Sequence, residues 1–417
     1  MKPKSKRTLT PKRRFPEFRK KPGWEEKTGD SLFDQINDRN PTPGLPVLAI
    51  TQEHGAIPRD MIDYHVSVTE KSIESYKVVQ VGDFIISLRS FQGGIEYSQY
   101  HGICSPAYVI LRRCTEGSDA YFKHYLKTDR FIQVLTRNLE GLRDGKMISY
   151  KQFSELLLPV PSPPEQQKIA ECLSSLDGLI TAEGWKLEAL RDHKRGLMQQ
   201  LFPQPGETQP RLRFPEFRDK GEWYTAPLGD LFETMTGGTP DRAVAEYWDG
   251  DIPWLTTSLL NFNIINNAEE FISHVGLQNS SAKLFPKHTV LVAIYGQGKT
   301  RGKVAMLGFE ATTNQACVAI LPGDGIEPTF TFLSLCGRYE EMRSLSNSGG
   351  QENLSQCLLR GLPFSYPKDV AEQQKIAACL TALDTQIAAQ ASKLDALKTH
   401  KRGLMQQLFP SPEEIES

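Results

Sequence analysis

The residues best suited to chemistry in this 417-residue chain lie in a glycine-rich stretch, Gly296-Gln-Gly-Lys-Thr300, which follows an apolar run. Glycine-rich loops that end in Lys and Thr often cradle a phosphate group. The phosphate-loop pattern needs another glycine at position 293, where the chain has Ala293, and in the dinucleotide pattern Gly302 comes one residue late. Two main interpretations remain: a tight hairpin, or a loop whose backbone and cations contact nucleic-acid phosphate.

Other donors, cations and aromatic rings gather in loops of two separate regions of the chain. Arg and Gln side chains can read base edges by paired hydrogen bonds, while Lys, Ser and Thr bind phosphate well. Any one of these residues alone is more typical of ordinary surface, and only their clustering suggests an interface. The candidates are Arg89, Ser90, Gln92, Tyr97, Arg143 and Lys146 in the first region, and Thr256, Thr257, Ser258, Tyr295, Gln297, Lys299, Arg301, Lys303, Gln351 and Asn353 in the second.

Catalytic and metal-binding patterns are missing from the sequence. The eight histidines form no H-E-x-x-H motif, and there is no G-x-S-x-G and no Asn/Asp-Pro-Pro-Tyr/Phe of the kind that amino-methyltransferases use. The seven cysteines form no C-x-x-C pair and no cluster with histidine. We therefore expect no catalytic residues, no metal and no cofactor in this chain.

Composition narrows the class of protein only a little. The formal net charge of −1 neither favours nor excludes a nucleic-acid partner, because a basic face can be balanced elsewhere. The odd cysteine count without a secretory signal favours a reducing, cytoplasmic environment. No apolar run approaches ~18 residues, so no membrane span is expected.

The elements that must position these loops are two copies of one stretch. Residues 165–203 and 372–410 both open with Glu-Gln-Gln-Lys-Ile-Ala and both close with His-Lys-Arg-Gly-Leu-Met-Gln-Gln-Leu-Phe-Pro. A hexapeptide, Arg-Phe-Pro-Glu-Phe-Arg, also occurs twice, at 14–19 and at 213–218. The repeat unit is therefore a globular region followed by a long helix.

These boundaries predict seven segments and an α+β fold. Short buried strands are expected at 45–50, 82–88 and 107–111 and again at 252–256, 289–295 and 316–321, with helices around 121–137 and 328–345. The segments are a basic N-terminal arm (1–13), a first globular region (14–164), a first helix (165–203), a linker (204–212), a second globular region (213–371), a second helix (372–410) and a C-terminal tail (411–417).

Both helices carry apolar residues at the 3.5-residue spacing of a coiled coil. Glu183 and its equivalent Gln390 interrupt this seam and could fix its register. The alternative is that both are ordinary core helices of separate domains. The predicted seam residues are Ile169, Leu173, Leu176, Ile180, Leu187 and Leu190 in the first helix and Ile376, Leu380, Leu383, Ile387, Leu394 and Leu397 in the second.

Connectivity sets the direction of the pair. The second globular region begins about ten residues after the first helix ends, so the second helix must run back, antiparallel, to the first region. The whole is expected to be a pseudo-twofold internal repeat. At 1.5 Å per residue, ~35 helical residues would separate the two regions by about 50 Å.

The duplicated helices and hexapeptides together resemble the specificity (S) subunit of type I restriction–modification systems. The resemblance covers essentially the whole chain after the arm. It is also carried by Gly237-Gly-Thr-Pro240, by Asp251-Ile-Pro-Trp-Leu255, and by Arg89–Tyr97 with Ser105–Tyr108, which is similar to another recognition variant of the family. The first region lacks an equivalent of Gly-Gly-Thr-Pro.

The resemblance implies a non-catalytic, DNA-binding subunit of a restriction system. The two globular regions, 14–164 and 213–371, would be target-recognition domains, and each would read one half of a bipartite, asymmetric double-stranded DNA site. The helices would dock two modification (methyltransferase) subunits, which bind S-adenosylmethionine, and through the complex the restriction subunits. Two other hypotheses stay open from the residues: an interaction scaffold without DNA binding, and a nucleotide-hydrolysing enzyme built on residues 296–300.

Overall fold

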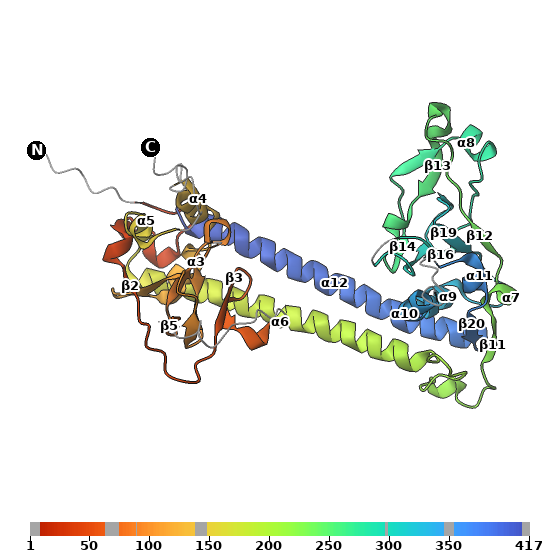
Figure 1. The fold of residues 1–417 in the computed structure, drawn as a ribbon, viewed down its shortest axis with the longest axis horizontal. Helices are drawn as coiled ribbons and strands as arrows, with labels where there is room; N and C mark the ends of the chain where they lie inside the picture. The colour runs from red at the N-terminus through yellow and green to blue at the C-terminus, as the bar shows by residue number, and fades with distance from the viewer. Residues whose placement is uncertain are drawn as a thin grey trace, which may run out of the picture. The chain divides into compact units, whose positions relative to one another are not determined.

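The computed structural model describes residues 9–62, 75–88, 90–137, 148–296, 299–345 and 354–410. The chain divides into two compact units, unit 1 with residues 1–184 and 392–417 and unit 2 with residues 185–391. Two long helices, α6 (Pro163–Leu201) and α12 (Val370–Leu408), each begin in one unit and end in the other (Figure 1). Both helices therefore belong to two cores.

Unit 1 combines short strands with short helices around the beginning of α6. Its largest sheet has four antiparallel strands in the order β2-β9-β6-β7, and β1-β10, β3-β4 and β5-β8 form pairs. The strands are β1 (Glu25–Thr28), β2 (Phe33–Ile36), β3 (Leu48–Thr51), β4 (Gly55–Pro58), β5 (Lys77–Val79), β6 (Phe84–Ile86), β7 (Glu96–Tyr97), β8 (Gly102–Cys104), β9 (Val109–Arg113) and β10 (Leu157–Val160). The helices are η1 (Pro16–Phe18), η2 (Gly29–Ser31), η3 (Arg59–Met61), α2 (Ser90–Gly93), α3 (Asp119–Tyr125), α4 (Asp129–Arg137) and α5 (Tyr150–Ser154).

Unit 2 repeats this plan with different loops and a larger sheet. Its five-stranded sheet has the order β12-β19-β16-β17-β14, with β14 parallel to β17, beside a three-stranded sheet β15-β13-β18 and the pair β11-β20. The strands are β11 (Tyr224–Pro227), β12 (Thr234–Thr236), β13 (Trp248–Leu255), β14 (Asn263–Ile265), β15 (Glu270–Ile272), β16 (Val290–Ala293), β17 (Val304–Leu307), β18 (Thr312–Thr313), β19 (Cys317–Ile320) and β20 (Pro363–Tyr366). The helices are η4 (Pro215–Phe217), α7 (Leu228–Leu231), η5 (Ala245–Tyr247), η6 (Thr257–Leu259), α8 (His274–Gln278), α9 (Pro328–Gly337), α10 (Tyr339–Ser344) and α11 (Gln356–Arg360).

The end of each long helix completes the core of a unit. In unit 1 the Phe409 ring lies 5.6 Å from the rings of Tyr121 and Tyr125. In unit 2 the equivalent Phe202 ring lies 5.2 Å from Phe330. Burial of each aromatic side chain contributes about 2–3 kcal/mol, so both helix ends are held by packing rather than by helix propensity.

The α+β class and the long antiparallel helices are confirmed, and helices form in both stretches where they were expected. Each of the stretches 121–137 and 328–345 contains two helices, α3 and α4 in unit 1 and α9 and α10 in unit 2. In unit 1 the break falls at Thr128, whose hydroxyl accepts the Phe131 amide and starts a new helix. In unit 2 it falls at Arg338, whose φ of −106° and ψ of 19° leave the helical region.

The predicted seam residues are all buried or half-buried. Ion pairs flank the seam and follow the repeat: Asp177 pairs with Lys401 in unit 1, and the equivalent Asp384 pairs with Lys194 at 2.5 Å in unit 2. The polar seam positions differ, since Glu183 pairs with Lys393 at 2.5 Å while Gln390 is buried. In both units, rising numbers in one helix meet falling numbers in the other.

A buried histidine joins α3 to this helix pair in unit 1. His124 Nε2 lies 3.2 Å from Ser174 Oγ, and its Nδ1 lies 3.8 Å from Asp177. Burial lowers the pKa of His124 to about 4, with Lys401 acting in the same direction and Asp177 against it. In unit 2 the thiol of Cys336 faces the equivalent charges, Lys194 and Asp384.

The stability of unit 1 should therefore depend on pH through His124. Because the folded-state pKa is below the ordinary ~6.5, only the unfolded chain takes up this proton between about pH 6.5 and 4. Stability falls as pH drops through that window, by up to about 1.4 kcal/mol per pH unit, and is fully present above it. Hydrogen exchange of the α3 amides measures this.

The variant His124→Gln should flatten the pH dependence of α3 exchange while leaving that of α9 in unit 2 unchanged. The α9 amides serve as an internal control, because a thiol replaces the histidine there. Equal pH dependence of α3 exchange in wild type and variant would contradict the assignment.

Candidate nucleic-acid interface

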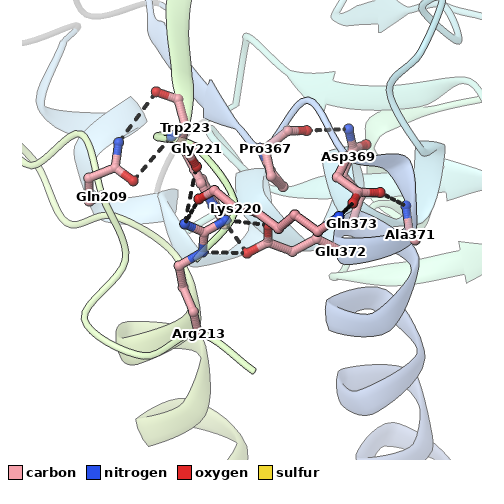
Figure 2. A network of polar contacts seen from close by, with 10 residues as sticks. All are labelled: Gln209, Arg213, Lys220, Gly221, Trp223, Pro367, Asp369, Ala371, Glu372 and Gln373. Carbon is pink, nitrogen blue, oxygen red and sulfur yellow. Dashed lines mark hydrogen bonds and ion pairs between the residues drawn. The ribbon is translucent and has the colours of Figure 1, made fainter. Parts of the chain in front are cut away.

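A buried polar network fixes the start of α12 in unit 2 (Figure 2). Arg213 binds Glu372 through two parallel hydrogen bonds, from Nε at 2.8 Å and from Nη2 at 2.6 Å. Arg213 Nη1 also donates to the carbonyls of Lys220 and Gly221, and Trp223 Nε1 donates to Glu372 at 3.3 Å. The hydrogen bonds to Glu372 raise the pKa of Arg213, so the guanidinium stays charged.

The next residue, Gln373, ties the same helix start to the recognition region. Its Nε2 donates to the carbonyls of Pro367 and Gly325, and its Oε1 accepts the Glu327 amide at 2.7 Å (Figure 2 shows the bond to Pro367). Glu327 in turn caps α9. The beginning of α12 therefore positions the helix that covers the five-stranded sheet.

Unit 1 contains the same network, built from the equivalent residues. Arg14 Nε and Nη2 each donate to Glu165 at 2.6 Å, and Gln166 accepts the Ser118 amide at 3.0 Å just before α3. We call Arg14, Glu165 and Gln166, and likewise Arg213, Glu372 and Gln373, the anchor networks. One difference between the copies is that Trp24 Nε1 is buried without a partner among the described residues, whereas the equivalent Trp223 Nε1 donates to Glu372.

The loops that the anchor network of unit 2 supports gather at one end of the five-stranded sheet. Residues 294–303 join β16 to β17, and the loop before β14 lies next to them because β14 runs parallel to β17. Two hydrogen bonds bridge the loops: Lys303 Nζ donates to Asn261 Oδ1 at 2.9 Å, and the Phe262 amide donates to the Val304 carbonyl at 2.8 Å.

Helix α10 adds a further cation and a ring to this end of the sheet. The Tyr339 hydroxyl donates to the Lys299 carbonyl at 2.6 Å and accepts from Arg343 Nη1 at 2.9 Å. The Arg343 guanidinium also lies 5.3 Å from the Tyr339 ring centroid. We define the hairpin-tip cluster by the following residues: Asn261, Phe262, Tyr295, Lys299, Arg301, Lys303, Tyr339 and Arg343.

The predicted residues in this cluster differ in exposure. Tyr295 and Lys299 are exposed, whereas Arg301 and Lys303 are half-buried. Thr256, Thr257 and Ser258 lie between β13 and Asn261, at the start of η6, with the hydroxyls of Thr256 and Ser258 2.5 Å apart. Cations, hydroxyls and rings on neighbouring loops suit a phosphate backbone and its bases.

The Gly-Gly-Thr-Pro segment has a structural role, because its glycines allow neighbouring backbone segments to approach closely. A Cβ on Gly237 would lie 2.2 Å from the Thr313 carbonyl oxygen, and one on Gly238 would lie 2.3 Å from Ser281. The segment therefore passes too close to its neighbours for any larger residue. Trp254 Nε1 donates to the Gly238 carbonyl at 2.9 Å, and the guanidinium of the nearby Arg242 lies over the Trp248 ring at 3.7 Å.

The predicted residues of unit 1 are less uniformly placed. Gln92 is exposed, and Tyr97 is half-buried beneath Lys123, whose Nζ lies 5.5 Å from the ring; burial raises the pKa of Tyr97. The prediction for Ser90 is wrong in its geometry, because the side chain is 1% exposed and its hydroxyl accepts the Ser87 amide. Ser90 shapes the turn and cannot reach a ligand.

An ion pair holds this segment of unit 1 in place. Lys127 pairs with the buried Glu96 and donates to the Gly93 carbonyl at 3.0 Å, so α2 and β7 are fixed to the end of α3. Burial raises the pKa of Glu96, and Lys127 opposes that change. Six predicted residues lie outside the described part of the chain: Arg89, Arg143, Lys146, Gln297, Gln351 and Asn353.

Sequence reasoning missed Asn261, Phe262, Tyr339 and Arg343. These residues carry no motif, and only the parallel pairing of β14 with β17 and the break before α10 bring them to the hairpin. Within the described ranges, no three His, Cys, Asp or Glu side chains are grouped to hold a metal ion. Over the same residues, no helix has the length and apolar character needed to cross a membrane.

Comparison with known proteins adds a family match. A family model described as the type I restriction modification DNA specificity domain matches residues 27–191 and 220–399, once in each repeat. The chain is 30% identical over 168 residues to the type I restriction enzyme MjaIX specificity subunit of Methanocaldococcus jannaschii, covering 39% of this chain and 38% of that one.

Two further likenesses extend along the chain. The EcoR124I/EcoR124II specificity subunit of Escherichia coli is 24% identical over 257 residues, which is 59% of each chain. Both sequence alignments thus span less than two thirds of these relatives. The crystal structure of the type I restriction–modification S subunit from M. genitalium superposes with a TM-score of 0.56 at 16% identity, covering 97% of this chain and 100% of that one, and so shares the fold.

Removing charge from one anchor network should loosen one unit. Glu372→Gln leaves the half-buried Arg213 without its carboxylate, which costs up to about 3–5 kcal/mol, the value for a fully buried pair. Amide exchange at 213–223 and at the start of α12 should rise accordingly, with unit 1 unchanged. Glu165→Gln should instead raise amide exchange in unit 1, around Arg14 and at the start of α6, and leave unit 2 unchanged.

The matched control is Glu216→Gln, which breaks the exposed pair with Lys375 (3.4 Å) in the same segment. Exposed pairs contribute about 0–1 kcal/mol, so little change is expected. If Glu372→Gln behaved like Glu216→Gln, the anchor network would not hold the helix.

Proposed function

This chain belongs to the family described by the type I restriction modification DNA specificity domain, and from that membership we propose that it is the specificity subunit of a type I restriction–modification complex. The subunit itself is non-catalytic. Each unit is a target-recognition domain that reads one half of a bipartite, asymmetric site in double-stranded DNA. The complex acts in the cytoplasm, where that DNA lies.

The observation that carries this proposal is the contrast between the anchor networks and the loops. Arg14 with Glu165 and Arg213 with Glu372 have the same hydrogen-bonding pattern, whereas the hairpin-tip cluster of unit 2 has no counterpart in the described part of unit 1. Identical supports with different loops suit two readers of two different half-sites. A scaffold without DNA binding would have no need of cations and rings gathered at a hairpin tip.

The repeated helices support a second part of the proposal. Both open with Glu-Gln-Gln-Lys-Ile-Ala and close with His-Lys-Arg-Gly-Leu-Met-Gln-Gln-Leu-Phe-Pro, so two copies of one partner would find equivalent surfaces at the helix ends. We assign these surfaces to two modification subunits, which supply S-adenosylmethionine and the methyl transfer to adenine, with restriction subunits joining through the complex. The continuous helices then set the spacing between half-sites.

Methylome sequencing of cells that carry this chain with its modification subunit tests the proposal. Adenine methylation should appear at one asymmetric, bipartite sequence. Absence of any sequence-specific methylation, with all partners present and the chain folded, would favour the scaffold without DNA binding.

Binding of the purified complex to that sequence gives the residue-level prediction. Lys303→Gln should lower the slope of log affinity against log salt by roughly one, because one phosphate contact is lost. Lys368→Gln, at the junction of β20 and α12, should leave the slope unchanged. If the two variants had equal slopes, the hairpin-tip cluster would not be part of the DNA interface.

A further inference from the structure

Phe262 combines a rare backbone conformation with an exposed aromatic ring. Its φ is +58°, in the left-handed region, and its side chain is 39% exposed. Bulky residues seldom adopt this conformation, which Gly and Asn accept far more easily. A ring placed there at a cost in backbone energy is a candidate for function.

Hydrogen bonds of Phe262 and of its neighbours hold the backbone in this conformation. The Phe262 amide donates to Val304, and Asn261 on one side is bonded to Lys303 Nζ and, through its amide, to Asn263 Oδ1 at 2.8 Å. The loop is thus tied both to the hairpin and to its own next residue. Phe262 is held at the entry to β14, the edge strand of the five-stranded sheet.

The ring itself contributes little to the interior. Phe262 is not a member of any hydrophobic core cluster among the described residues. Its contact is with Tyr339, edge to face, with ring centroids 5.2 Å apart and an interplanar angle of 88°. That contact orients the ring while leaving a large part of it open to solvent.

Three residues with cationic side chains, on separate segments, contact the neighbours of this ring. Lys303 reaches the neighbouring Asn261, Lys299 presents its carbonyl to the Tyr339 hydroxyl, and Arg343 donates to the same hydroxyl. An oriented ring among phosphate-binding side chains is the arrangement that stacks on nucleobases or wedges between them.

We propose that Phe262 is a specificity-determining residue that stacks against a base of the half-site read by unit 2 and unstacks one base step there. This inference rests on the proposed function and deepens it. Lys303 and Arg343 hold the flanking phosphates, and the Phe262 ring senses how readily that step opens.

The test uses the full complex with its modification subunits and a duplex carrying the sequence that the methylome identifies. 2-Aminopurine, which pairs with thymine, replaces in turn each adenine on either strand in and beside the two half-sites, except the methylated adenines. Binding of the wild-type complex should raise the fluorescence at one step of one half-site only. No rise at any position would overturn the proposal without the need for a variant.

Three variants locate the effect. Phe262→Asn keeps a residue that accepts a positive φ and removes the ring, so it should abolish the fluorescence rise and weaken binding roughly ten- to a hundredfold. Phe262→Tyr should retain both. Phe271→Ala, which removes another exposed Phe of unit 2 on β15, should behave as wild type.

The outcomes separate the two claims. A wild-type complex that methylates no asymmetric sequence contradicts the proposed function. A complex that methylates its site while Phe262→Asn binds within twofold of wild type, with the same fluorescence pattern, contradicts only the role of Phe262. Loss of binding with Phe271→Ala equal to that with Phe262→Asn would also contradict it.

Discussion

The buried ion pair at the start of each long helix is the interaction on which the rest of the structure depends. Glu165 and Glu372 are each 1% exposed, and a carboxylate so placed is tolerable only because an arginine meets it with two parallel hydrogen bonds. The arginine lies near the start of the repeat and the glutamate at the end of the globular region. The ion pair therefore links the beginning of each recognition region to its end, where the long helix starts.

The anchor networks separate the parts that the two units share from the loops that differ between them. The following glutamine reaches α3 or α9, and the strand pairs β1-β10 and β11-β20 lie beside the same junction with equivalent registers, Glu25 opposite Val160 and Tyr224 opposite Tyr366. The loops between those strands that contact neither long helix can change without disturbing the helix. The hairpin-tip cluster of unit 2 and the segment fixed by Lys127 and Glu96 in unit 1 are two different loop structures held by equivalent anchor networks.

The sequence allowed the long helices, their pairing and the duplication to be predicted, because a repeated stretch and a heptad spacing can be read directly from the order of the residues. The α+β class followed from short apolar runs. The anchor pairs were not predicted, although both of their partners lie in repeated motifs, since no local pattern joins residues 14 and 165. Ser90 was misassigned because burial depends on the fold, and Phe262, Tyr339 and Arg343 were missed because distant segments bring them together.

The most direct measurement of the central claim is the methylation specificity of a chain in which residues 224–366 also replace residues 25–160, with both anchor networks intact. If the anchors are equivalent supports, the chain folds and its complex methylates a site made of two copies of one half-sequence in opposite orientations, as antiparallel helices require. A folded complex that still methylates the original asymmetric site would contradict the account.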